Sequence, residues 1–309
     1  MVLVVKQYLL RRLIQLIPVV IGVSVIVFLM LRLSGDPAVL ILPEDALPEE
    51  IEILREALGL NEPIHVQYGI FLANAVRGDF GRSFRYRAPA LQVVLERLPA
   101  TLEMAGAALT FAVVVSLPLG IISAIRQNTL ADFLASSAAV VGRAMPGFWL
   151  GIMLILIFGV TLRWLPVSGR GGIANLILPT VALGMALAAT ITRLVRSSML
   201  EVIRQDYITT ARSKGLTERT VIYKHALRNA LIPVVTMLGL QTAALMGGQM
   251  IMEAVFAWPG TGRLAIQALY MRDMAIVQAV VVIKALIVIF ANLVVDVVYT
   301  IIDPRIKYS

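Results

Sequence analysis

The sequence contains no cysteine and only two histidines in its 309 residues. The absence of cysteine excludes disulfides, thiolate metal sites and a cysteine nucleophile. Charged residues are scarce as well, at 15%, whereas hydrophobic residues make up 59% and the mean hydropathy is +0.87. These values lie outside the range of an ordinary soluble domain, so the composition predicts a membrane protein.

Motifs for nucleotide binding and hydrolysis are missing too. Glycine is nowhere followed by lysine, so the chain has no Walker-type loop to hold nucleotide phosphates. It also lacks the G-x-S-x-G pattern of serine hydrolases and the H-E-x-x-H pattern of zinc proteases. The net charge of +8 does not indicate nucleic-acid binding, because no basic tract carries interleaved aromatic residues. We therefore expect no catalytic residue, no metal and no cofactor in this chain.

Six apolar runs are long enough to cross a bilayer, which needs roughly 20 apolar residues. They are 13–33, 100–125, 146–165, 173–195, 230–252 and 275–302. The first is too long for a signal peptide and lacks a small-residue cleavage site, so we expect it to remain as a span. The stretch 133–144 is predicted to be a cytoplasmic approach helix, because Arg143 is costly at membrane depth.

The distribution of basic residues predicts the orientation of the spans. Eight lysines and arginines lie between Arg193 and Arg228, with more at both termini, whereas the short loops on the opposite side carry four. Because loops rich in lysine and arginine stay in the cytoplasm, both termini are predicted to be cytoplasmic. His65 and His225 then fall on opposite sides of the membrane and cannot share a metal.

The segment 34–99 is predicted to form a small helical subdomain outside the membrane. Pro48 suits the start of a helix, and Gly59 stands where a C-terminal cap would go. A second helix is expected to follow from Pro63 and to stop at Gly78.

The segment 193–229 is the longest predicted cytoplasmic loop, and its apolar residues recur at helical spacing. A helix is expected to continue from the fourth span as far as Gly215, after which Thr217 is placed to cap a second helix. A solvated loop that only fixes topology is one interpretation, yet such a loop would not require two amphipathic helices. We interpret the apolar face as an exposed surface for a partner.

This loop resembles the cytoplasmic EAA loop of ATP-binding-cassette (ABC) importer permeases. The stretches "DYITTARSKGL" and "HALRNALIPV" are close to the peptide and nickel subfamily, although the general pattern is broken at its Glu, its middle Ala, its Ile and its Pro, which Arg228 replaces. The opening "YLLRRLIQLIPVVIGVSVIVFLMLRLSGDPA", the outward "GDFGRSFRYRAP", the later "EAVFAWPGTGRL" and the terminal "NLVVDVVYTIIDPR" are also similar to that subfamily. The resemblance covers the chain end to end and favours the first, B-type, permease subunit.

The resemblance implies partners and residue roles in a prokaryotic inner membrane. The expected partners are a second permease subunit, two cytoplasmic ABC ATPases that bind ATP and Mg, and an extracytoplasmic substrate-binding protein. Gly215 is expected to permit the turn, and Leu216 to fill an apolar pocket of an ATPase. The expected ATPase-coupling residues are Asp206, Tyr207, Ala211, Arg212, Lys214, Gly215, Leu216 and Thr217.

Polar residues in the last span are candidates for the translocation path. Lys284 lies about 14 Å from the outer end of the run, where an ammonium group facing lipid would be costly. Asn292 and Asp296 lie one helical turn apart and therefore share a face. A purely structural polar contact between helices is the alternative for all three.

The segment after the fifth span carries candidates for docking the binding protein, with simple anchoring at the membrane interface as the alternative. The docking candidates are Glu253, Phe256, Trp258 and Arg263. In the third span, Gly147 and Gly151 form a small-xxx-small pattern that permits close helix packing, within this chain or against the second permease.

The sequence thus predicts an all-α polytopic fold similar to type I ABC importer permeases. The cytoplasmic N-terminus and first transmembrane helix occupy 1–33, the periplasmic subdomain 34–99, and a five-helix core 100–309. The resemblance implies ATP-driven import of dipeptides, oligopeptides, glutathione-like compounds or nickel complexes by alternating access. The alternatives are a secondary transporter or channel that uses Lys284 and Asp296 as a charge relay, and a membrane scaffold without transport.

Overall fold

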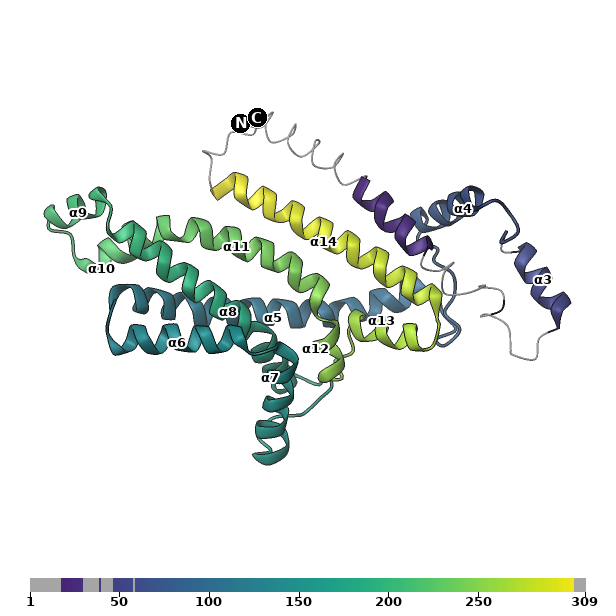
Figure 1. Cartoon of the computed structure of the whole chain (residues 1–309), viewed down its shortest axis with the longest axis horizontal. Coiled ribbons are helices and arrows are strands. Elements are labelled where there is room, and N and C mark those ends of the chain that lie inside the picture. The colour runs from purple at the N-terminus through teal and green to yellow at the C-terminus, as the bar shows by residue number, and fades with distance from the viewer. Residues whose placement is uncertain (1–17, 30–38, 40–46, 58, 303–309) are drawn as a thin grey trace. The chain divides into compact units, whose positions relative to one another are not determined.

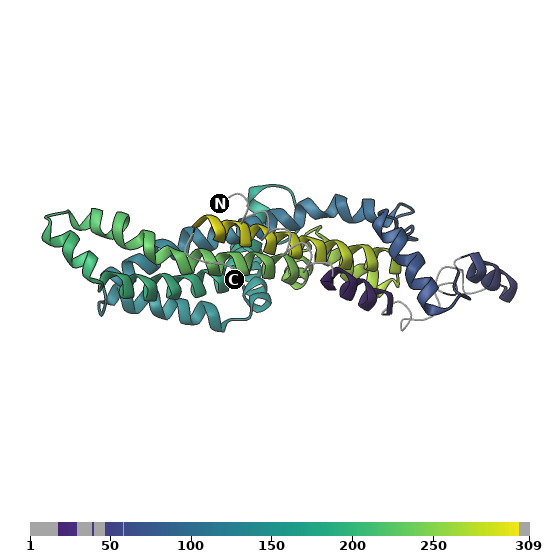
Figure 2. The ribbon, with the colours of Figure 1, turned by 90° about the horizontal axis from the view of Figure 1, so that it is seen from above.

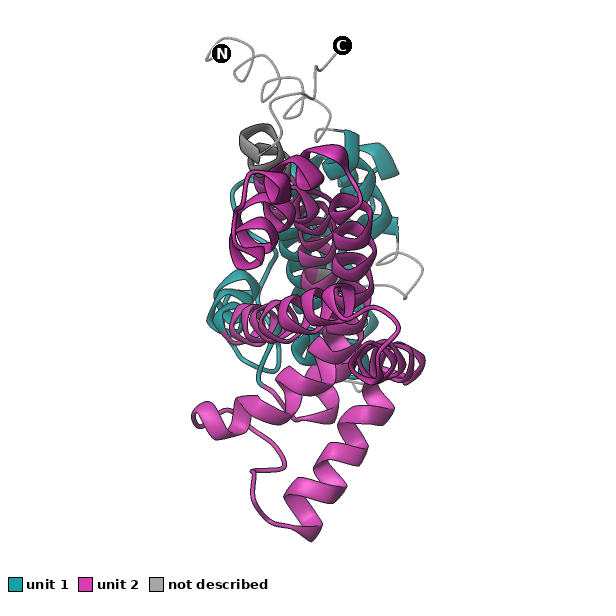
Figure 3. Cartoon of the chain, turned by 90° about the vertical axis from the view of Figure 1, so that its left-hand side faces the viewer, with its two compact units in different colours: residues 1–99, 259–289 teal, residues 100–258, 290–309 magenta. Residues whose placement is uncertain are grey.

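The computed structural model describes residues 18–29, 39, 47–57 and 59–302. This part of the chain is helical, and within it the one extended pairing is an isolated bridge between Arg82 and Pro89. The predicted all-α fold is therefore confirmed. The chain forms two compact units, 1–99 with 259–289 and 100–258 with 290–309 (Figure 3). The predicted division into periplasmic and membrane parts stays a prediction.

In the first unit, an apolar helix, Pro18–Leu29, packs on α4 (Ile64–Val76). The ring of Phe28 lies 5.5 Å from that of Tyr68 and 5.9 Å from that of Phe71, measured between centroids. Aromatic pairs at this separation add to the free energy gained by burying apolar surface. The contact therefore joins the start of the chain to the helical segment that follows it.

The turn residues of this unit lie where the sequence predicts them. α3 (Pro48–Ala57) begins at the expected proline, and Gly59 follows it with φ +64°. Pro63 directly precedes α4, and Gly78, with φ +78°, follows its end. Both glycines adopt the left-handed conformation that other residues avoid, so the two helices end where the backbone demands glycine.

Two further helices belong wholly or partly to the first unit, α13 (Thr261–Tyr270) and the start of α14 (Met274–Ile302). Between them, the carboxylate of Asp273 accepts a hydrogen bond from the hydroxyl of Ser83 at 2.5 Å. Asp273 is 3% exposed, so this bond satisfies a buried carboxylate and ties the 79–89 loop to the start of α14.

The second unit contains the remaining helices, and Figures 1 and 2 show α6 and α11 running along α8. Most of α5 (Ala90–Ile125) also belongs to it. The others are α6 (Leu130–Ala144), α7 (Gly147–Leu154) with its π-helical continuation η1 (Ile155–Thr161), α8 (Ile173–Ile203), α9 (Asp206–Ser213), α10 (Glu218–Thr220), η2 (Val221–Ala226), α11 (Leu227–Gly248) and α12 (Met250–Val255).

Two glycines allow α5 and α8 to touch backbone to backbone. A Cβ on Gly184 would lie 2.8 Å from the carbonyl oxygen of Ala108, and one on Gly120 would lie 2.9 Å from that of Thr192. No side chain tolerates such a distance, so small residues set the close packing of this helix pair.

Four helices are long and apolar enough to cross a membrane, namely Ala90–Ile125, Ile173–Ile203, Glu218–Met246 and Met274–Val295. They correspond to the predicted second, fourth, fifth and sixth spans. The predicted first span, 13–33, lies largely outside the described residues, where only the apolar helix Pro18–Leu29 is seen. The predicted count of six is therefore neither reached nor contradicted.

The predicted third span differs in an informative way. The helical stretch Gly147–Thr161 is only 15 residues long, roughly 22 Å, and is too short to cross a core about 30 Å thick. It qualifies as a span only together with α6, from which it bends by 102°. Met145, which precedes Pro146, is extended (φ −78°, ψ 126°), as expected of a residue before proline, and this breaks the helix. The break lies at the predicted boundary between the approach helix and the third span, and a span at 146–165 stays a prediction.

Candidate functional site

The candidate coupling site is the segment that connects α8 to α11. α8 ends at Ile203, and the extended conformation of Gln205 (φ −78°, ψ 150°) redirects the chain into α9. Gly215 then turns the chain with φ +75°, and its N–H donates to the carbonyl of Arg212 at 2.9 Å. Figures 1 and 2 both show α9 and α10 beyond the ends of α5 and α6. The predicted helix–glycine–helix arrangement is confirmed, with one additional break before α9.

The turn at Gly215 is held by charged and polar side chains. The guanidinium of Arg212 donates two hydrogen bonds to the carboxylate of Glu218, at 2.7 and 3.2 Å, across the turn. This bond to the carboxylate raises the pKa of Arg212, so the side chain stays charged. Thr217 precedes α10 as predicted, but its hydroxyl contacts that of Thr220 at 2.9 Å and does not cap the helix.

A second polar contact joins α9 to the start of α11. The amide of Asn229 donates to the hydroxyl of Tyr207 at 2.7 Å, so the two arms of the segment are linked at their base as well as at the turn. Polar links at both ends of so short a segment favour one geometry over many.

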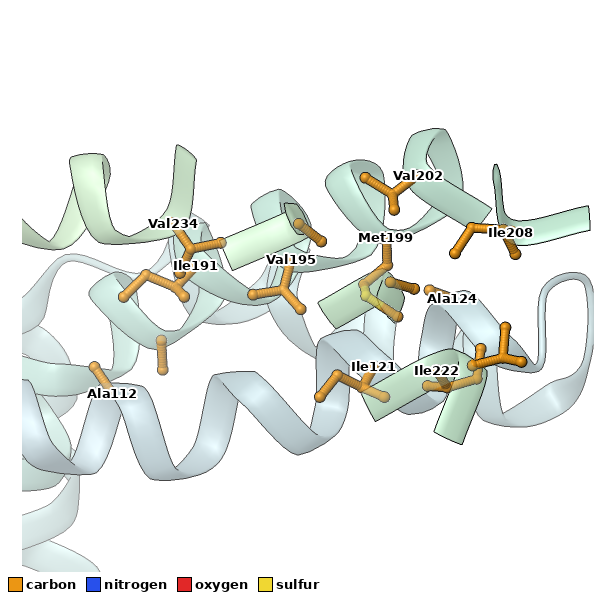
Figure 4. Packing of buried hydrophobic residues seen from close by; sticks show 14 of the residues in the cluster. Ala112, Ile121, Ala124, Ile191, Val195, Met199, Val202, Ile208, Ile222 and Val234 are labelled. Carbon is orange, nitrogen blue, oxygen red and sulfur yellow. The ribbon is translucent and has the colours of Figure 1, made fainter. Parts of the chain in front are cut away.

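The apolar faces of the two arms are buried within the chain. Ile208 of α9 and Ile222 of η2 are 0% and 3% exposed. They belong to one cluster with Ile121 of α5 and with Met199 and neighbouring residues of α8 (Figure 4). The helical periodicity therefore reflects packing against the spans, and the prediction that this whole face is exposed for a partner is wrong. Sequence spacing identifies an apolar face but not what covers it.

The predicted coupling residues separate into two groups. Ala211 is buried in the cluster, so it supports the segment and is not available for contact. Leu216 and Tyr207 are 40% and 38% exposed, and Tyr223 of η2, which was not in the predicted set, is 54% exposed. The remaining exposed members of the predicted set are Asp206, Arg212, Lys214, Gly215 and Thr217. An exposed apolar tip with a polar rim is the composition of a protein contact surface.

The three predicted path residues lie in α14, and the structure describes the side chains of two of them. Lys284 is half-buried and its Nζ is shielded from solvent, which agrees with the expectation that it does not face lipid. Asn292 is exposed on α14. Asp296 lies in the same helix, and its side chain is outside the described residues.

The predicted docking residues are largely inaccessible. Glu253 and Trp258 are both fully buried, where Glu253 accepts a hydrogen bond from Thr101 at 2.8 Å and the indole N–H of Trp258 donates to the carbonyl of Ala100 at 2.7 Å. Phe256 is 1% exposed. The prediction that these three residues form a docking or interfacial patch is wrong, because they fasten the end of α12 to α5 and α7. These polar partners are far away in sequence, so local pattern could not reveal them.

Arg263 is the one predicted docking residue that stays partly exposed. It lines a pocket of about 190 Å³ in the first unit, together with Tyr86 and Arg97.

The small-xxx-small pattern is explained by packing within the chain, because a Cβ on Gly151 would lie 3.1 Å from the ring of Phe256.

Sequence reasoning missed an ion pair between α6 and α8. Asp132, 5% exposed, accepts hydrogen bonds from the Nε and Nη2 of Arg196 at 2.7 and 2.8 Å. Ser123 of α5 and the N–H of Asn128 also donate to this carboxylate. The available signal was an aspartate in the first turn of an apolar helix, where a charge requires a partner.

The described residues contain no group of three or more His, Cys, Asp or Glu side chains placed to hold a metal ion. The described side chains of the coupling segment carry no arrangement of nucleophile and base either. What the segment offers is an exposed, partly apolar tip on a buried base.

The chain matches two family models. Residues 116–308 match "Binding-protein-dependent transport system inner membrane component", and residues 5–105 match the N-terminal region of the same class of membrane component. Among curated proteins, it is 43% identical to the dipeptide transport system permease protein DppB of Alkalihalophilus pseudofirmus, over 97% of this chain and 99% of that protein. It is 44% identical to the glutathione transport system permease protein GsiC of Escherichia coli, over 98% and 99% respectively.

Solved structures agree in fold. The chain is similar to the MetNI methionine ABC transporter in inward-facing conformations, with a TM-score of 0.58 and 22% identity over 69% of this chain and 97% of that one. It is also similar to an amino acid ABC transporter crystallised with histidines, with a TM-score of 0.53 and 18% identity over 67% and 93%. At this level of identity the likeness concerns the fold alone.

Proposed function

The chain belongs to the family of binding-protein-dependent transport system inner membrane components, and on that premise we propose that it is the permease subunit of an ATP-driven importer of peptides or related small solutes. The high identity to a dipeptide permease and a glutathione permease over nearly the whole chain supports this class of cargo. Two cytoplasmic ATPases, a second permease and an external binding protein complete the proposed assembly. In it, the termini and the coupling segment face the cytoplasm.

The observation that carries the proposal is the construction of the coupling segment. Its tip, at Gly215 and Leu216, is exposed, whereas Ile208 and Ile222 anchor its base in the cluster shared with α5 and α8. A force applied to the tip therefore moves the ends of two spans, because close-packed interiors transmit displacement. The segment acts as the contact through which closure of the ATPases changes the exposure of the path.

The tip has the geometry that a groove-docking contact requires. A Cβ placed on Gly215 would meet no atom of this chain within 4 Å, so the space beside the turn is open. In the proposed assembly the ATPase backbone occupies that space, and Leu216 enters an apolar pocket at the centre of the contact. Lys214 and Asp206 lie at the rim, where charges affect the rate and specificity of association more than its strength.

The test is uptake by the reconstituted assembly. We expect peptide uptake to require ATP hydrolysis and to continue when proton and sodium gradients are collapsed. Uptake that is abolished by uncouplers and unchanged by removal of the ATPase would instead favour a secondary transporter that uses Lys284 and Asp296 as a charge relay. The same preparation, screened with external binding proteins and their ligands for increased ATP hydrolysis, identifies the cargo.

A further inference from the structure

The second unit contains an open cavity of about 660 Å³ beside the ion pair of α6 and α8. Its volume lies within the range of about 300–1,000 Å³ that is usual for small-molecule sites. The lining residues come from α6, α8 and α11, and they are Ser136, Val140, Arg143, Thr190, Arg193, Leu194, Arg196, Ser197 and Met237. Three of them are arginines and none is acidic.

The arginines are not equivalent. Arg196 is paired bidentately with Asp132, so its charge is balanced. Among the described residues, neither Arg143 nor Arg193 has a carboxylate partner, and both are exposed to the cavity side of the chain. The charges of Arg196 and Asp132 cancel, and those of Arg143 and Arg193 do not, so the net charge at the cavity is about +2.

The position of these charges makes their lack of partners costly. Arg193 lies near the end of the predicted fourth span, and Arg143 lies beside an earlier turn of α8, because a Cβ on the adjacent Gly142 would be 3.6 Å from the Cβ of Ala189. An arginine inside the hydrocarbon region costs about 2.5–3.5 kcal/mol unless it meets water or an anion. The cavity lies along α8 from Thr190 to Ser197 and gives both guanidinium groups room to meet water or an anion.

The hydroxyl groups of the cavity are set to accept hydrogen bonds. Thr190 donates its proton to the carbonyl of Ala186 at 2.9 Å, and Ser197 donates to that of Leu194 at 3.0 Å. Ser136 likewise donates to the carboxylate of Asp132, at 3.3 Å. Each oxygen keeps lone pairs that can accept an N–H from a ligand.

We propose that this cavity binds the terminal carboxylate of the transported peptide, with Arg143 and Arg193 as its ligands. This inference rests on the proposed import of peptides and adds the group that the permease itself recognises. The planar guanidinium fork matches a carboxylate in bidentate geometry. The hydroxyl oxygens accept the peptide N–H groups, and Val140, Leu194 and Met237 contact its apolar side chains.

The same mixture of donors and acceptors disfavours an anionic lipid. The guanidinium groups suit a phosphate as well as a carboxylate, but a phosphate headgroup has no N–H to donate to the three hydroxyl oxygens, whose protons are already used within the chain. Arg196, held by Asp132, serves as a positioning residue that fixes the wall of the cavity between α6 and α8.

The test measures binding of trialanine and of its C-terminal amide to the membrane-embedded complex, without the external binding protein, in phosphatidylcholine nanodiscs. We expect the acid to bind about tenfold more tightly than the amide, since charge-assisted pairs are the strong ones. Arg143→Gln and Arg193→Gln should each reduce this preference, and the double variant should abolish it while leaving affinity for the amide unchanged. Arg193→Lys should keep part of the preference, and Arg126→Gln, an exposed arginine outside the cavity, should keep all of it.

Several outcomes overturn the proposal. Equal affinities of the wild-type complex for trialanine and its amide would overturn it. An unchanged preference of the double variant for the acid would overturn it as well. If nanodiscs containing phosphatidylglycerol block peptide binding, and mass spectrometry finds that lipid retained by the wild type but not by the double variant, the cavity takes a lipid headgroup instead. ATP-dependent uptake of trialanine by the same preparation is measured separately. The proposed import and the proposed carboxylate site can therefore be supported or refuted independently.

Discussion

Replacing Gly215 by aspartate tests the coupling segment most directly. Gly215 has φ +75°, a conformation that costs a residue with a Cβ roughly 1–2 kcal/mol. Because a Cβ there meets no atom within 4 Å, no steric term adds to this cost inside the chain. We therefore expect Gly215→Asp to insert and fold while its carboxylate occupies the space that the ATPase needs.

A matched control separates backbone strain from loss of contact. Gly169 has φ +81°, and a Cβ there also meets nothing within 4 Å, but it lies in the loop between η1 and α8, away from the coupling segment. Gly169→Asp carries a similar strain of roughly 1–2 kcal/mol and should leave ATPase association unchanged. Any difference between the two variants then reports on the contact itself.

The assay is co-purification of the ATPase with the tagged permease from solubilised membranes, with membrane insertion followed in parallel. A central contact residue contributes about 2 kcal/mol or more, so Gly215→Asp should reduce association at least about 30-fold. Gly215→Ala, which adds strain and little volume, should have an intermediate effect. Normal recovery of the ATPase with Gly215→Asp would refute the assignment of this turn as the contact.

Three further results are expected. Lys284→Met should change uptake without changing assembly if the residue lines the path, and unaltered uptake of several peptides would assign it a structural role. Asp132→Asn should lower the thermal midpoint of the purified protein, because breaking its largely buried ion pair with Arg196 costs about 3 kcal/mol. An unchanged midpoint would contradict a stabilising role for the pair. Gly151→Leu should lower the thermal midpoint in the same assay, since even a Cβ there would lie 3.1 Å from the ring of Phe256. Gly147→Ala should leave the midpoint unchanged, since its Cβ would lie 3.7 Å from the nearest atom. Equal midpoints for the two variants would argue against close packing at Gly151.

The buried ion pair and the coupling segment illustrate different limits of prediction. The turn at Gly215 was predictable because its cause is local, a glycine between two periodic segments. The pair of Asp132 and Arg196 was not, because 64 residues separate the partners and only the packing of α6 on α8 brings them together. Charge in an apolar helix signals that a partner exists without indicating which one.

Burial explains the predictions that were wrong. Trp258 and Glu253 are residue types that suit both a membrane interface and a buried hydrogen-bonded position, so composition alone could not choose. The structure places their polar atoms on Ala100 and Thr101, more than 150 residues earlier in the chain. The same ambiguity applied to Ile208 and Ile222, whose periodic spacing suits a partner surface or an internal core equally well.

Local chemistry therefore determined that this protein is helical, membrane-spanning and turned at its glycines, because hydropathy and backbone conformation depend on neighbouring residues. Tertiary structure alone decided which apolar face is covered and which polar side chains are buried. It also decided which arginines have partners, and so left Arg143 and Arg193 facing a shared cavity. These properties depend on distances between segments far apart in the chain, and a linear pattern does not record such distances.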